Sequence, residues 1–301
     1  RITLPPSTYA QEKHKIEVRM PEAIKFIREN QLNDHFDGDI NDVGIICQGG
    51  LYNATLRALV QAGLAEASGD SRIPILALNV TYPLVPDEIS NFCAGKSAIL
   101  MVEEGQPDYL EEAINVILRK ADLQTKVIGK GPLPMAGEYT AEVVLRGLSE
   151  FLRQTAPKGV DLAVATAPIQ ELDQHKAKAM ELLGDVLPAR PPTFCTGCPE
   201  RPLFSAIRIL EKDLGPTHVS CDIGCHTFST LPPFNLGNTV LGYGLGLSSA
   251  AGVAPNFDKR VISIMGDGGF WHNGVTNGVG SALFNKADGV LMVIKNGYTS
   301  A

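Results

Sequence analysis

Short apolar runs alternate with amphipathic stretches along the first half of the chain. Runs of strand length occupy residues 43–47, 75–80, 98–102 and 126–128. Apolar residues at helical spacing occupy residues 51–62, 86–92 and 109–119. Because strands that alternate with helices form a parallel sheet with helices on both faces, this pattern predicts an α/β domain over residues 38–155.

The second half repeats this alternation after a proline-rich boundary. Strands are expected at residues 217–220, 260–265 and 289–294, and helices at 199–212, 240–252 and 274–284. Pro188, Pro191 and Pro192 end any preceding helix. We therefore predict two doubly wound parallel-sheet α/β domains. The order is a connecting segment at 1–37, a domain at 38–155, a linker at 156–192 and a second domain at 193–301.

Composition narrows the class of protein. The chain has 301 residues, of which 44% are hydrophobic and 20% charged, and this length suits two globular domains. A net charge of −7 gives no electrostatic basis for binding nucleic acid. No run of about 18 apolar residues predicts a membrane span. Cys47 and Cys93 lie in apolar stretches, which indicates buried thiols in a reducing, cytoplasmic setting.

The strongest chemical signal is the spacing of two polar residues behind consecutive strands. Gly266-Asp267-Gly268 follows one predicted strand, and Asn296 follows the next after 27 intervening residues. Glycines let the backbone approach a phosphate, and carboxylate and amide oxygens suit Mg²⁺. Because ends of adjacent parallel strands lie side by side, this spacing predicts a diphosphate–metal site, with the carbonyl of Tyr298 as a further ligand. The alternative is two unrelated tight turns.

A second signal is a group of four cysteines within 31 residues, namely Cys195, Cys198, Cys221 and Cys225. Thiolates at such spacings suit an iron–sulfur cluster or zinc. The alternative is that these thiols pack around another group.

Several segments together resemble the indolepyruvate:ferredoxin oxidoreductases, in the 2-oxoacid:ferredoxin oxidoreductase superfamily. The stretch from Gly266 to Asn296 resembles the thiamine diphosphate binding motif. Further blocks that resemble this family are residues 191–199, 222–227, 231–233, 241–246 and 270–274. The first domain is similar to the transketolase C-terminal-like middle domain of the family, on residues 4–6, 44–46, 82–84 and 102–104.

The sequence departs from the family pattern at three positions. Glu200 stands where the family usually has histidine, Lys295 where it more often has aspartate, and Gly297 where many thiamine enzymes have a second asparagine. These departures leave the metal ligands intact and leave the substrate and the subfamily open.

The resemblance implies a set of site residues. Contacts to thiamine diphosphate would come from Thr196, Cys198, Asp222, Ile223, Gly224, Gly266, Asp267, Gly268 and Asn296. Asp267, Asn296 and the Tyr298 carbonyl would hold Mg²⁺. A [4Fe–4S] cluster would use Cys195, Cys198 and Cys225, with its fourth ligand beyond Ala301 or Cys221 in its place. His272 is a candidate proton donor, with a structural hydrogen bond as the alternative.

The resemblance also implies an activity. An aryl-2-oxoacid such as indolepyruvate would be oxidatively decarboxylated with CoA, and the electrons would pass to ferredoxin or a similar acceptor. We expect the chain to be part of a larger polypeptide in a homodimer or hetero-oligomer. A pyrimidine-binding domain would precede Arg1 or lie on another chain, and the thiamine domain would continue past Ala301. The alternatives are a non-oxidative decarboxylase or carboligase, and a non-catalytic assembly subunit.

Overall fold

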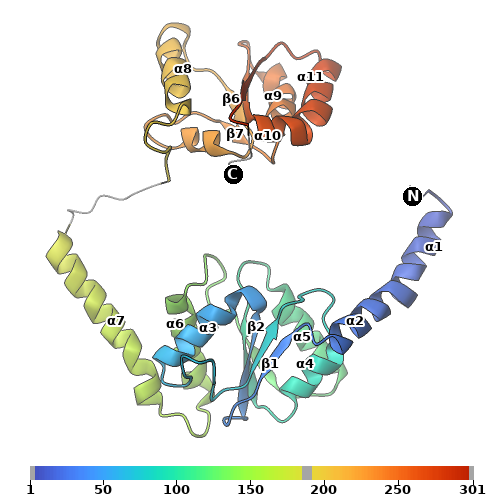
Figure 1. Ribbon diagram of the computed structural model, residues 1–301, viewed down its shortest axis with the longest axis vertical. Coiled ribbons are helices and arrows are strands. Elements are labelled where there is room, and N and C mark those ends of the chain that lie inside the picture. Colours follow the sequence, from blue (N-terminus) through green and yellow to red (C-terminus); the bar gives the residue numbers. More distant parts are fainter. Residues whose placement is uncertain (1–3, 185–191, 298–301) are drawn as a thin grey trace. The chain divides into compact units, whose positions relative to one another are not determined.

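The protein forms two compact units, Arg1–Val186 and Leu187–Ala301, and each is described here by itself. A computed structural model describes residues 4–184 and 192–297 of the chain (Figure 1). Within these residues, no helix combines the length and the hydrophobicity needed to cross a bilayer.

The first unit contains a five-stranded sheet in the order β1-β3-β2-β4-β5. Its strands are β1 (Asp34–Phe36), β2 (Val43–Gln48), β3 (Ile75–Leu78), β4 (Ala98–Val102) and β5 (Lys126–Ile128). Strands β2 to β5 are parallel, as predicted, whereas β1 pairs antiparallel with β3. Strand β1 corrects the assignment of residues 1–37 to a connecting segment. Its three residues are too few for an apolar alternation to be recognised.

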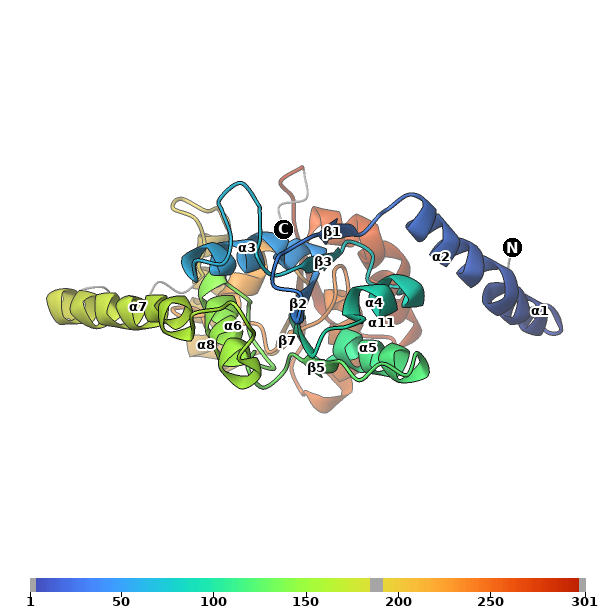
Figure 2. The ribbon, with the colours of Figure 1, turned by 90° about the horizontal axis from the view of Figure 1, so that it is seen from below.

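Helices cover both faces of this sheet. Helices α3 (Tyr52–Gln61) and α6 (Ala141–Thr155) lie on one face, and α4 (Pro86–Cys93) and α5 (Tyr109–Lys120) on the other (Figure 2). Neighbouring residues of β2 point to opposite faces of the sheet. Ile45 packs in the hydrophobic core with α3 and α6, and Ile46 packs in the hydrophobic core with α4 and α5. Burial on both faces explains why these strands read as continuous apolar runs rather than as an alternation.

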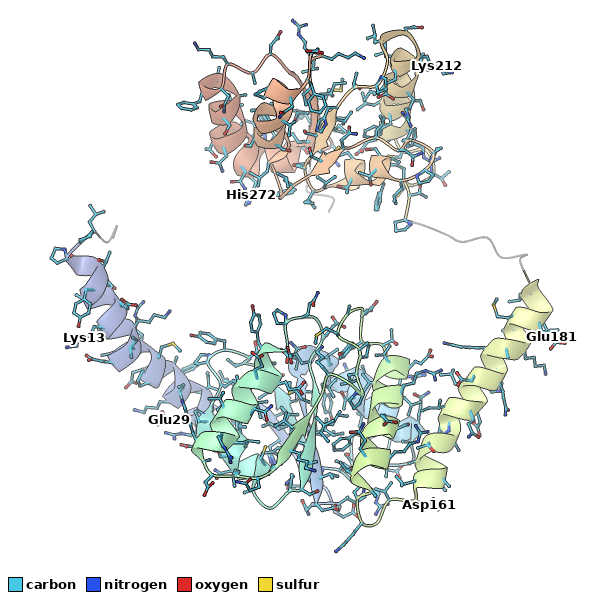
Figure 3. All side chains as sticks on the ribbon, turned by 180° about the vertical axis from the view of Figure 1, so that it is seen from behind. Lys13, Glu29, Asp161, Glu181, Lys212 and His272 are labelled. Atoms are coloured by element: carbon cyan, nitrogen blue, oxygen red, sulfur yellow. The ribbon has the colours of Figure 1, made fainter. Side chains whose placement is uncertain are left out.

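Two helical segments extend the first unit. The N-terminal one comprises α1 (Ser7–His14), η1 (Lys15–Arg19) and α2 (Met20–Glu29). The other, α7 (Leu162–Leu183), lies within the segment interpreted as a linker, and Figure 3 labels its two ends at Asp161 and Glu181. Asp161 caps α7 by accepting the N–H of Ala163 at 3.0 Å. Arg146 of α6 pairs with Asp173 in the middle of α7, so this helix is fastened to the unit.

The second unit contains a four-stranded parallel sheet in the order β7-β6-β8-β9. Its strands are β6 (Val219–Cys221), β7 (Thr239–Val240), β8 (Ile262–Gly266) and β9 (Val290–Ile294). Its helical segments are α8 (Glu200–Leu214), η4 (Cys225–Thr230), α9 (Gly246–Val253), η5 (Ala254–Asn256), α10 (Asp267–Gly269), η6 (Phe270–Val279) and α11 (Gly280–Phe284). Two units of mostly parallel α/β sheet confirm the predicted fold class.

One predicted helix starts later than expected. Residues 240–252 were assigned to a single helix, but Thr239–Val240 is a strand paired with β6 and α9 begins at Gly246. Gly244 separates them with a φ of +78°, a conformation that glycine adopts without strain. The glycine-rich run is therefore a loop between a strand and a helix.

Two buried thiols make the first unit less stable as the pH rises into the alkaline range. Cys47 and Cys93 are fully buried, as predicted, and burial raises the pKa of each thiol from 9.0 to about 12. Between those pH values only the unfolded chain ionises, so the free energy of unfolding falls as pH rises. Replacing both cysteines by alanine should reduce the slope of the unfolding free energy against pH by at most about 1.4 kcal/mol per pH unit for each thiol.

Urea unfolding at pH 7 to 11, followed by circular dichroism, measures this slope. The native and substituted proteins should show parallel pH dependence below pH 8, where no thiol ionises in either state. Equal slopes above pH 9 would contradict the assigned cause.

Candidate cofactor-binding site

The carboxyl ends of three strands in the second unit bring the predicted polar residues to one edge. Asp222 follows β6, Asp267 follows β8, and Asn296 follows β9 by two residues. The register aligns these ends, because Cys221 pairs with Ile264 and Gly266 pairs with Ile294. Parallel pairing therefore gathers three loops that are far apart in the sequence.

Asp267 joins two of these loops through its carboxylate. One oxygen accepts the N–H of Gly268 at 3.0 Å, and the other accepts the N–H of Gly297 at 2.9 Å. Gly297 has a φ of +85°, which turns the chain directly after Asn296. The residues predicted to bind metal, Asp267 and Asn296, thus belong to loops held together by a hydrogen bond. Tyr298, the third predicted ligand, lies outside the described residues.

The space beside these loops is open. A Cβ atom built at Gly266 would meet no described atom within 4 Å. An anionic carboxylate, a neighbouring amide and a glycine-lined backbone are the donors that a metal-bound diphosphate requires. The residues present therefore fit such a group.

Asp222 is the buried centre of this edge. Its side chain is inaccessible to solvent, and one carboxylate oxygen accepts the N–H of Gly244 at 2.9 Å. The other oxygen contacts Nε2 of His226, which is 2% exposed. Its own N–H donates to the carbonyl of Ile264 in β8 at 3.2 Å. Asp222 thus fastens the end of β6 to both neighbouring segments.

Glycines give this carboxylate the room that it occupies. A Cβ atom at Gly269 would lie 2.0 Å from Oδ2 of Asp222, and one at Gly244 would lie 2.3 Å from the carbonyl oxygen of Gly269. A Cβ atom at Gly246 would lie 3.0 Å from the N atom of Asp222. The backbone approaches Asp222 so closely that only glycine fits without movement of its neighbours.

The predicted cysteine ligands are placed differently. Cys195 is exposed, whereas Cys198 and Cys225 are partly exposed. Cys221 is buried, and burial raises the pKa of its thiol to about 12. Among residues 4–184 and 192–297, no group of three or more His, Cys, Asp or Glu side chains is arranged to hold a metal ion. Cys195, Cys198 and Cys225 are not brought into such a group among these residues, and the iron–sulfur cluster stays a prediction.

The remaining predicted residues with side chains are exposed at the surface of the second unit. Ile223 is 44% exposed, and Thr196 and His272 are also exposed. The His272 ring packs against that of Tyr243, with 5.3 Å between the centroids, and Figure 3 labels it on η6. The described contacts join neither Thr196 nor His272 to the Asp267 loop, so their assigned roles remain predictions.

Sequence reasoning did not identify two buried features. Glu200 was considered only as a departure from a pattern, yet it is 8% exposed and begins α8. The pairing of Asp222 with His226 was also not predicted. Asp222 lies before η4 and His226 within it, so the contact depends on how the chain turns between β6 and η4, which the sequence pattern does not reveal.

These features define the class of domain to which the second unit is similar. Residues 222–301 match the family described as thiamine pyrophosphate enzyme, C-terminal TPP binding domain. The matched stretch begins at Asp222 and includes the Asp267 and Asn296 loops.

Comparison of the whole chain with known proteins finds relatives named as indolepyruvate oxidoreductase subunits, which confirms the predicted resemblance to that family. The chain is 28% identical to the indolepyruvate oxidoreductase subunit IorA of Methanothermobacter marburgensis, over 98% of this chain and 44% of that protein. The subunit IorA of Methanothermobacter thermautotrophicus is likewise 28% identical, over 98% of this chain and 44% of its own length. The subunit IorA of Archaeoglobus fulgidus is also 28% identical, over 91% of this chain and 40% of its own length. The chain thus spans less than half the length of these relatives.

Among solved structures, a split gene transketolase described as an inactive beta4 tetramer aligns with 46% of this chain and 41% of its own. The sequence identity is 20% and the TM-score is 0.28.

The close approach at Gly269 yields a prediction with a matched control. Gly269→Ala would force its Cβ atom against the Asp222 carboxylate and should destabilise the second unit by about 1–3 kcal/mol. Gly280→Ala, in the same helical run, meets nothing within 4 Å and should be neutral or stabilising by up to about 1 kcal/mol. Urea unfolding followed by Trp271 fluorescence measures both. Equal effects would show that the space around Asp222 is not limiting.

Proposed function

We propose that the second unit binds thiamine diphosphate through Mg²⁺ and that the chain is part of a 2-oxoacid oxidoreductase. The observation that carries this proposal is the hydrogen bond from the Gly297 N–H to Asp267, beside Asn296, at the edge where phosphate-binding loops of parallel sheets lie. Asp267 and Asn296 would hold the metal, with the carbonyl of Tyr298 as a further proposed ligand. The family match over residues 222–301 supports this cofactor.

Each residue of the edge has a physical task in this proposal. The Asp267 carboxylate supplies a fixed negative charge to the metal that neutralises a diphosphate. Gly266 and Gly268 leave the backbone open to phosphate oxygens. Ile223 and Gly224 would border the reactive ring, and the exposed Ile223 side chain offers it an apolar contact. When bound, thiamine diphosphate supplies the nucleophilic carbon that decarboxylation of a 2-oxoacid requires.

The substrate and partners follow from the relatives by analogy. Their names describe indolepyruvate oxidoreductase subunits, so we propose an aryl-2-oxoacid as substrate. By the same resemblance, CoA would accept the acyl group and ferredoxin the electrons. A pyrimidine-binding domain, in the same polypeptide or a partner chain, would complete the cofactor site. His272 and Thr196, exposed at this unit, are proposed contacts to substrate and cofactor.

An iron–sulfur cluster receives no support from the described geometry. Cys195, Cys198 and Cys225 form no metal-binding group among the residues that the structure describes.

The metal site is tested by Asp267→Ala. Loss of the carboxylate should abolish Mg²⁺-dependent binding of thiamine diphosphate, because the remaining amide of Asn296 cannot balance the charge of the ion. Asp258→Ala is the matched control, since this exposed aspartate precedes β8 at its opposite end. Isothermal titration calorimetry of the full-length protein measures both variants. Unchanged affinity in Asp267→Ala would sink the proposal.

The oxidative reaction is tested separately on the full-length protein under anaerobic conditions. Indolepyruvate should be decarboxylated with reduction of a viologen dye, and this reduction should depend on CoA and thiamine diphosphate. Release of CO₂ without dye reduction would instead identify a non-oxidative decarboxylase. Absence of both, with cofactor still bound, would identify a non-catalytic subunit.

A further inference from the structure

Cys195 and Cys198 lie at the two ends of a tight turn. The N–H of Cys198 donates to the carbonyl of Cys195 at 3.2 Å. Gly197, the third of the four residues, has a φ of +74°. A hydrogen bond that closes four residues, with a positive φ at the third, is typical of a type II β-turn. Because the Cα atoms at the ends of such a turn lie less than about 7 Å apart, the two cysteines are close neighbours in space.

The turn gives the two cysteines the spacing that a disulfide needs. Two cysteines are bridged without movement of the backbone where their Cα atoms lie about 4.4–6.8 Å apart, and the ends of a β-turn fall within about that limit. Both thiols are also accessible, since Cys195 is exposed and Cys198 is partly exposed, whereas Cys221 is buried. The pair therefore combines proximity with the access that thiol–disulfide exchange requires.

Helix α8 holds the chain on both sides of the turn. Phe194, which precedes the turn, is 3% exposed, and its ring packs against that of Phe204 in α8 with 5.4 Å between the centroids. Arg201, in the first turn of α8, donates from its guanidinium to the carbonyl of Phe194 at 2.7 Å. Two groups held in a fixed geometry react with each other more readily than with a second molecule from solution. The flanking contacts therefore favour a bond between the two cysteines.

We propose that Cys195 and Cys198 are a redox-active dithiol that closes reversibly to an intramolecular disulfide. The co-reactant is a low-molecular-weight disulfide such as glutathione disulfide. The exposed Cys195 thiolate attacks one sulfur of this molecule, breaks its S–S bond, forms a mixed disulfide and releases a first glutathione thiolate. The Cys198 thiolate then attacks the Cys195 sulfur and releases the second. Two protein thiols are oxidised, one glutathione disulfide is reduced to two thiols, and the protein's two thiol protons pass to the released thiolates.

This dithiol goes beyond the proposed function and does not depend on it. The inference uses the geometry of the turn and its flanking contacts, and none of these involves thiamine diphosphate. It competes with the predicted iron–sulfur cluster, because a disulfide leaves no thiolate of Cys195 or Cys198 to bind iron. The two roles therefore exclude each other in any one molecule.

Incubation of the full-length protein with glutathione buffers, with oxygen excluded, tests the dithiol. After alkylation with iodoacetamide, mass spectrometry examines the tryptic peptide of residues 179–208, in which Cys195 and Cys198 are the only cysteines. As the share of glutathione disulfide rises, this peptide should lose two hydrogens and carry neither an alkyl group nor glutathione. Glutathione on both cysteines, or alkylated thiols in excess glutathione disulfide, would overturn the proposal. Iron that protects both thiols from exchange would also overturn it.

Two single variants test the order of attack. Cys198→Ser should stop the reaction at the mixed disulfide, with one glutathione on Cys195, because no second thiol displaces it. Cys195→Ser leaves the less accessible thiol, which should react with glutathione disulfide about tenfold more slowly. Equal rates in the two variants would contradict Cys195 as the attacking thiol.

Gly197 tests whether the turn brings the thiols together. Gly197→Ala places a Cβ atom in open space but in a backbone conformation that residues other than glycine rarely adopt. The equilibrium constant for disulfide formation, measured on the same peptide, should therefore fall about tenfold. Thr196→Ala is the matched control, since the second position of a type II turn has an ordinary negative φ, and its constant should not change. An equal constant in the native and Gly197→Ala proteins would overturn the proposal that the turn creates this dithiol.

Discussion

The second unit depends on one buried carboxylate, that of Asp222. A carboxylate removed from solvent is costly without partners, and here a backbone N–H donates to one oxygen and an imidazole contacts the other. Each partner comes from a different segment, so satisfying the charge fixes the Gly244 loop and the η4 turn around the end of β6. The glycines at 244 and 269 follow from the same constraint, because the loops can reach the carboxylate only where no Cβ atom intervenes.

Parallel strand pairing brings the loop that Asp222 stabilises next to the other loops of the candidate site. The register between β6, β8 and β9 places the Asp222, Asp267 and Asn296 loops at one edge of the sheet. Asp222 is buried, and its carboxylate contacts the Gly244 N–H and the His226 ring, so it stabilises the loops at this edge. Asp267 contacts the loop of Asn296 and remains partly exposed. The buried acid supplies rigidity, and the exposed one is available for a ligand.

Much of this arrangement can be predicted from the sequence, for identifiable reasons. Strands buried on both faces, such as Ala98–Val102, stand out as apolar runs, and the strand before each polar loop located Asp267 and Asn296. The short strands β1 and β7 were missed because two or three residues carry no period. The burial of Glu200 was missed because burial of a charged residue depends on tertiary neighbours, which no local pattern encodes.

A comparison of the two units shows why the proposed cofactor site lies in the second. Both place a carboxylate directly after a sheet strand, Glu103 after β4 and Asp267 after β8. Glu103 is 4% exposed, and both of its oxygens accept N–H groups from the first turn of α5, so it completes the protein's own helix start. Asp267 also accepts two backbone N–H groups in its described contacts, but its side chain is partly exposed, and a carboxylate offers about four acceptor positions. The unused capacity, beside an amide and an open glycine backbone, is what a metal ion needs. Equivalent topology therefore gives a structural cap in one unit and an edge open to a ligand in the other, and the difference lies in whether the fold buries the carboxylate.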